Sequence, residues 1–187
     1  MLSVELRRWT VDEYHQMIEA GILTPDDRVE LIDGEIIRKS PNRPPHAATV
    51  QNISDYLTSL LVGKAHIRMQ LPITLSTSEP EPDIAIVRWR DNRYVDRHPM
   101  AEDILWLIEV SHTTLAFDRG RKGVIYAREG IPEYWVLDVR DRQVYVYTNP
   151  TQTGYGQEAI VSDNGVLALP SDRQVQLPVA GLFLPPM

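Results

Sequence analysis

Two carboxylates border apolar runs, where an ionised side chain is costly to bury. Asp83 comes directly before the apolar residues 84–87, and Glu109 is the only charged residue of the run "ILWLIEV". A buried carboxylate without a partner is neutralised through a raised pKa, whereas a nearby cation keeps it ionised. If both runs are strands and their carboxylates meet, the pair predicts a site for a hard divalent cation, which prefers oxygen ligands.

A lysine follows these carboxylates at a distance that a strand and a turn can span. Lys122 lies 13 residues after Glu109, early in an expected helix. If that helix packs back over the sheet, Lys122 reaches Glu109, where its charge can assist phosphodiester hydrolysis. Each residue also has a plainer interpretation. Asp83 could be a polar residue at a strand start, and Lys122 a solvated helix residue. Glu109 could form a salt bridge with an arginine or a lysine, for which Lys122 is one candidate.

The first part of the chain predicts a helix, a hairpin and a second helix. Thr10 and Glu13 have the spacing of a capping box for a helix that ends at Gly21. Residues 28–40 form two β-prone runs around Asp33-Gly34, which favours a two-residue turn. Apolar residues at three- and four-residue steps predict a helix over 44–64, with His46 near its start.

The rest of the chain predicts mainly strands. Strands are expected within 65–76 and 83–88, at 104–110, at 133–139 and at 143–149, and a surface loop over 88–103. A helix over 118–130 is expected to be capped by Asp118 and ended by Gly130. The order of elements indicates an α/β (α+β) fold in which helices flank a central sheet. Residues 1–187 are interpreted as a single domain.

The amino-acid composition excludes some kinds of site and argues against some kinds of partner. The chain has no cysteine, which excludes disulfides and zinc sites built on thiolates. The net charge of −7 argues against tight non-specific binding to phosphates, although residues 118–123 form a small basic patch. The sequence has no apolar run typical of a signal peptide or membrane helix, so a soluble cytoplasmic protein is expected.

The order of short motifs resembles the Uma-two family, a branch of the PD-(D/E)XK nuclease superfamily. These motifs, between about Thr10 and Tyr147, are "ELIDGE", the helix opening with His46, Pro82-Asp83, "IEVS", "DRGRK" and "YAREGIPEYWVLDV". The resemblance implies a restriction-endonuclease-like core with a central mixed sheet. It assigns metal binding to Asp83, Glu109 and the backbone carbonyl of Val110, and catalytic roles to Asp83, Glu109, Lys122 and Glu30.

The chain departs from the superfamily pattern at Ser111, where a lysine is expected two residues after the glutamate. In this family the lysine is relocated to the following helix, and Lys122 matches that position. The implied function is Mg²⁺-dependent hydrolysis of DNA by an endonuclease, with Mn²⁺ as an alternative ion and a homodimer expected by analogy.

Two other functions stay open: an inactive nuclease-fold protein with a binding or regulatory role, and an enzyme of this fold with another substrate. His46 is either a site residue or a packing residue at a helix start. Glu79 and Glu81 are expected to be solvated neighbours of Asp83. For Glu30 and Glu35, beside the hairpin turn, exposure to solvent is the plainer alternative.

Overall fold

The computed structural model describes residues 6–41 and 43–185, and its centre is a six-stranded sheet. The strands follow the chain in order across this sheet: β3 (Ala65–Met69), β4 (Ile84–Arg88), β5 (Ile104–Ser111), β6 (Glu133–Asp138), β7 (Gln143–Thr151) and β8 (Gly154–Ser162). Only β5 and β6 are parallel neighbours, and the other neighbouring pairs are antiparallel. The expected mixed sheet is therefore confirmed.

The parallel pair requires a crossover, which is helical and lies on one face of the sheet. It consists of α3 (Leu115–Phe117), the π-helical turn η3 (Asp118–Lys122) and α4 (Gly123–Arg128). The prediction that Asp118 caps this helix is wrong, because the helical segment begins at Leu115. Asp118 instead lies inside it and accepts hydrogen bonds from the Ser111 and Thr114 hydroxyls, both at 2.6 Å.

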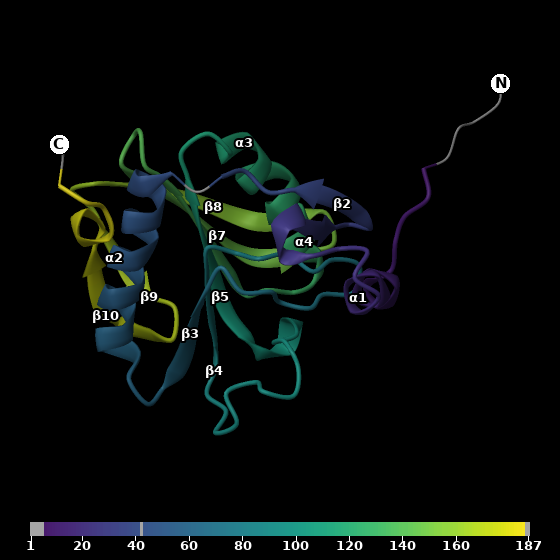
Figure 1. Cartoon of the computed structure of the whole chain (residues 1–187). Helices are drawn as coiled ribbons and strands as arrows, with labels where there is room; N and C mark the ends of the chain where they lie inside the picture. The colour runs from purple at the N-terminus through teal and green to yellow at the C-terminus, as the bar shows by residue number, and fades with distance from the viewer. Residues whose placement is uncertain (1–5, 42, 186–187) are drawn as a thin grey trace.

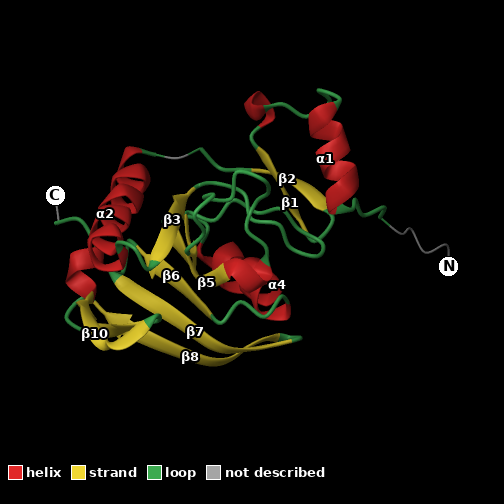
Figure 2. Ribbon diagram, turned by 90° about the horizontal axis from the view of Figure 1, so that it is seen from below, coloured by secondary structure: helices red, strands yellow, loops and turns green. Residues whose placement is uncertain are grey.

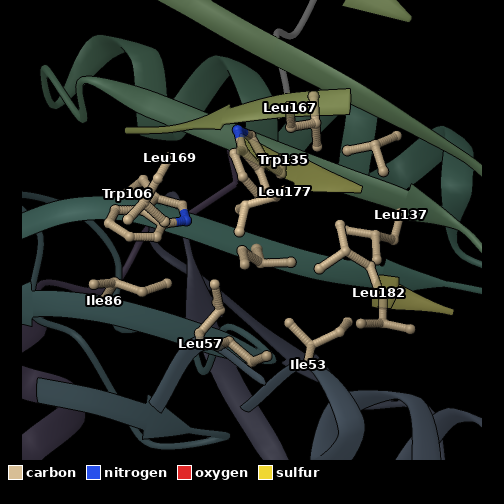
Figure 3. Packing of buried hydrophobic residues seen from close by; sticks show 14 of the residues in the cluster. Ile53, Leu57, Ile86, Trp106, Trp135, Leu137, Leu167, Leu169, Leu177 and Leu182 are labelled. Carbon is tan, nitrogen blue, oxygen red and sulfur yellow. The ribbon is translucent and has the colours of Figure 1, made fainter. Parts of the chain in front are cut away.

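The opposite face of the sheet is covered by α2 (Pro44–Leu61) and by the last elements of the chain (Figure 1). These are the hairpin of β9 (Val166–Leu169) and β10 (Asp172–Pro178), followed by the short helix η4 (Val179–Leu182). Figure 3 shows Trp106 and Trp135 of the sheet in one cluster with α2 and hairpin side chains. Burial of this apolar surface holds the layers together.

The face of the sheet that carries the crossover also carries the N-terminal elements. Figure 2 shows the first helix of the chain beside the first hairpin. Helix α1 (Val11–Glu19) has the predicted capping box of Thr10 and Glu13. It is followed by η1 (Pro25–Asp27) and the antiparallel hairpin of β1 (Val29–Ile32) and β2 (Glu35–Arg38). Asp33 and Gly34 both have positive φ, 51° and 75°, as a type I′ turn requires, so the predicted two-residue turn is confirmed.

Some predicted elements have other bounds in the structure. Strand β3 covers only the first part of the run 65–76, because it ends at Met69. The stretch 70–83 that follows contains no regular strand. The expected loop over 88–103 contains the buried Tyr94 and the short helix η2 (Ala101–Asp103). No described helix is long and apolar enough to cross a membrane. The ends of the expected single domain, residues 1–5 and 186–187, lie outside the described part.

Candidate active site

The two carboxylates come together because β4 and β5 are antiparallel neighbours. Ile84 pairs with Ile108, so the residue before β4 meets the last residues of β5. The Asp83 amide lies 3.4 Å from Oε2 of Glu109, and the Val110 amide donates to Oδ2 of Asp83 at 2.8 Å. Asp83 is 9% exposed and Glu109 is 4% exposed. Two acidic side chains therefore share one buried position at the sheet end.

The crossover brings Lys122 to the same position from the next layer. Its Nζ lies 2.9 Å from Oε1 of Glu109 and 3.6 Å from Oε1 of Glu30, and the residue is only 6% exposed. The Tyr126 hydroxyl, one helical turn later, donates to the same Glu109 oxygen at 3.1 Å. Lys122 thus points into the protein and not to solvent.

Burial and mutual charge shift the pKa values of both Glu109 and Lys122. Burial raises the pKa of Glu109 well above its usual value, although the Lys122 ammonium opposes this shift. Burial would lower the pKa of Lys122, but the negative charge of Glu109, together with that of Glu30 and other neighbouring groups, raises that pKa well above its usual value. Each charge therefore depends on the other to remain in the interior.

Asp83 has its own hydrogen-bond partner in His46, near the start of α2. Nε2 of His46 lies 2.9 Å from Oδ1 of Asp83, and Nε2 of Gln70 donates to the same oxygen at 3.2 Å. The hydrogen bond to Asp83 raises the pKa of His46, although burial opposes it. Burial alone would raise the pKa of Asp83, but the hydrogen bonds from His46 and Val110 lower it. Asp83 is therefore held as an anion.

The acids around this pair have different environments from those expected. Glu30 is buried at 5% exposure, and its Oε2 accepts the Glu81 amide at 3.1 Å. The expectation that Glu79 is solvated is wrong, because it is 4% exposed and lies 3.0 Å from Nε2 of His15. Glu81 is partly buried and forms an ion pair with Lys39. Of these three acids, Glu30 forms an ion pair with Lys122.

A cavity of about 540 Å³ opens onto these groups. Its lining includes Asp83, Glu109, Val110, Lys122 and Glu30, together with His46, Gln70, His112 and Asp118. Ser111, which replaces the standard lysine, does not line it and is bound to Asp118 instead. The residues that the sequence suggested as metal ligands or catalytic groups therefore all line this one cavity.

The donor chemistry at the base of this cavity suits a hard divalent cation. From the described residues, Oε2 of Glu109 accepts one long hydrogen bond, which leaves it with lone pairs for a ligand beside Asp83. Among the described residues, no group of three or more His, Asp or Glu side chains is arranged to hold a metal ion. An ion bound by Asp83 and Glu109 would therefore need the Val110 carbonyl and water to complete its coordination.

Gln70 and His112 are among the polar residues of this cavity that sequence reasoning missed. Gln70 reaches Asp83 because β3 pairs with β4, with Met69 opposite Ile84. The predicted strands within 65–76 and 83–88 could have suggested this contact if they had been paired as a hairpin. The irregular stretch after Gln70 gave no turn from which to predict the pairing register. His112 follows β5 directly, and its buried Nδ1 has no hydrogen-bond partner among the described residues. Its place immediately after the Glu109 strand was the signal available.

Comparison with known proteins identifies the family and a shared fold. The Uma2 family model, described as "Putative restriction endonuclease", matches residues 11–180. A crystal structure of "a putative nuclease belonging to DUF820" from Anabaena variabilis superposes with a TM-score of 0.74 at 20% identity, over 93% of this chain and 97% of that chain. At this identity the superposition shows a shared fold. No curated protein matches the chain significantly.

Proposed function

The chain belongs to the Uma2 family, and on that premise we propose that it is a metal-dependent endonuclease that hydrolyses phosphodiester bonds of DNA. The observation that carries this proposal is the convergence of Asp83, Glu109 and Lys122 in one cavity. Two adjacent carboxylates and a buried lysine match the needs of phosphodiester hydrolysis, in which negative charge grows on a phosphate.

In this proposal Asp83, Glu109 and the Val110 carbonyl hold Mg²⁺, with Mn²⁺ as an alternative. When bound, the ion supplies Lewis-acid polarisation of a phosphate oxygen and lowers the pKa of water. The chain's own groups supply orientation. The Val110 amide and Gln70 fix the Asp83 carboxylate through hydrogen bonds of 2.8 and 3.2 Å, so the ligand is positioned before substrate arrives.

Lys122 provides the positive charge of the chain nearest to the two carboxylates. Its ammonium is fixed by Glu109 and Glu30, and it needs little reorganisation when charge develops on a phosphate. The Tyr126 hydroxyl donates to the same Glu109 oxygen as Lys122 and so helps to fix this carboxylate. Burial of these groups excludes water and strengthens their electrostatic effect.

The test is nicking of supercoiled plasmid DNA with Mg²⁺ or Mn²⁺. Wild type is expected to nick, whereas Asp83→Asn is expected to lose at least a hundredfold in rate, the typical effect of losing a key electrostatic group. Lys122→Arg keeps a buried cation but replaces a compact ammonium by a planar fork, so only partial activity is expected. Absence of nicking by wild type with both metals would favour the non-enzymatic alternative. Equal nicking by Asp83→Asn would refute the assignment of the site.

A further inference from the structure

The mouth of the active-site cavity carries three arginines that form no ion pair with any described residue. Arg28 and Arg38 lie at the open end of the β1–β2 hairpin, where Val29 pairs with Arg38. Arg43 is the N-cap residue of α2, at the end of the segment that leaves β2. All three are exposed and line the cavity. The neighbouring Lys39 differs from them, because Glu81 neutralises it.

The cavity is lined by equal numbers of acidic and basic residues, but most of the acids are buried and the arginines are exposed at its mouth. Five acidic and five basic residues line the cavity, although the whole chain has a net charge of −7. The acids Glu30, Asp83, Glu109 and Asp118 are buried, whereas the three arginines are exposed. A polyanion is therefore repelled by the protein as a whole and attracted to this mouth, where it meets positive charge before the buried acids.

We propose that Arg28, Arg38 and Arg43, here called the arginine rim, bind the phosphate backbone of DNA beside the bond to be cleaved. This inference rests on the proposed function and assigns the residues that provide substrate affinity. Guanidinium groups bind phosphate oxygens in a bidentate manner. Arg28 directly precedes β1, Arg38 ends β2 and Arg43 caps α2, and all three line the same cavity, so the rim offers several cationic groups to successive phosphates.

The expected size of the effect follows from counterion release. Each phosphate contact contributes about 0.9 to the slope of log affinity against log salt on duplex DNA. Loss of three contacts should therefore reduce the slope by up to about 2.7. Over a fourfold rise in salt, from roughly 50 to 200 mM, this corresponds to a difference of about 40-fold between the affinity losses of wild type and variant.

The experiment measures binding of fluorescein-labelled duplex DNA by anisotropy in EDTA, so that cleavage does not contribute. The triple variant Arg28→Gln, Arg38→Gln, Arg43→Gln is compared with wild type across this salt range. The matched control replaces Lys64, Arg93 and Arg140 by glutamine, which removes the same charge from exposed residues that do not line the cavity. Thermal melts should show all three proteins folded, because the side chains of the rim make no hydrogen bonds or ion pairs with described residues.

Weaker binding and a reduced salt slope in the rim variant alone would support the proposal. Equal slopes for the rim and control variants, or no DNA binding by wild type, would overturn it. Competition by poly-glutamate as effective as competition by unlabelled DNA would overturn nucleic acid as the occupant. The plasmid assay separates the two proposals. Nicking that is unaffected by the rim substitutions would refute the role of the arginine rim and leave the proposed endonuclease function standing. DNA binding that depends on the rim, without any nicking, would refute the endonuclease function and leave the role of the rim standing.

Discussion

Replacing Lys122 by methionine tests whether the buried ion pair with Glu109 controls the stability of the site. Methionine keeps much of the length of the side chain but removes its charge, so the Glu109 carboxylate loses the ammonium at 2.9 Å. Both residues are more than nine-tenths buried. Breaking such a pair from one side typically costs about 3–5 kcal/mol, because an uncompensated charge remains in the interior. For a chain of this size, 3 kcal/mol corresponds to a fall of roughly 6–12 °C in Tm.

The cost should depend on pH, because Glu109 can escape the penalty by binding a proton. Burial already raises the pKa of Glu109 above its usual value, and removal of Lys122 takes away the main influence that lowers it. A group whose pKa is higher in the folded than in the unfolded state stabilises the fold at low pH and loses this contribution as pH rises through the folded value. The deficit of Lys122→Met should therefore be larger at pH 8 than at pH 5.

The assay is thermal and urea unfolding in excess chelator, with a double-mutant cycle. Adding Glu109→Gln to Lys122→Met removes both charges, so the double variant should lose less than the sum of the single losses, with a coupling energy of roughly 1–3 kcal/mol. Lys64→Met is the control, because Lys64 is exposed and its substitution should change stability by less than about 0.5 kcal/mol. Additive losses, or a deficit that is constant with pH, would refute the buried ion pair.

Two further predictions concern parts of the fold away from the site. Gly34→Ala should destabilise the fold by more than about 1 kcal/mol, because φ is +75° and the added Cβ would lie 2.6 Å from the Cβ of Arg8. Gly21→Ala is the control, because Gly21 has a similar φ of +70° but open space around it, so this variant should lose less stability. Equal losses of stability in urea unfolding would exclude the Arg8 contact as the cause. Asp103→Asn should cost about 1 kcal/mol at pH 7. Burial alone would raise the pKa of Asp103, but the hydrogen bonds from the partly exposed Arg97 and from the Met100 amide, together with the Arg97 charge, lower that pKa. A depressed pKa stabilises above the unfolded value, so the deficit should shrink as pH falls below about 4, and an unchanged deficit at pH 3 would contradict this.

Local chemistry in the sequence was enough to predict much of the fold. The capping box at Thr10 and the Asp33-Gly34 turn depend on residues a few positions apart, and both were predicted correctly. The run 104–110 was predicted to be a strand because its sequence is almost wholly apolar, and β5 is buried at nearly every position. Such features need no knowledge of distant segments.

Features that depend on tertiary neighbours were not predicted. Asp118 has the residue type of a helix cap, but Ser111 and Thr114 donate to it from the preceding strand and turn, and the helix begins earlier. Glu79 is buried because His15 of α1 lies against it, 64 residues away in sequence. Gln70 reaches Asp83 through the register of β3 and β4.

The most direct test of the central claim is calorimetric titration of Mg²⁺ or Mn²⁺ into metal-free protein. We propose that Asp83 and Glu109 hold one ion together, so wild type should bind it, and Asp83→Asn and Glu109→Gln should each weaken binding at least tenfold. Asp103→Asn is the matched control, because it removes a buried carboxylate that does not line the cavity, and its binding should equal that of wild type. Equal binding by wild type and both site variants, or no binding by wild type at millimolar metal, would contradict the shared metal site.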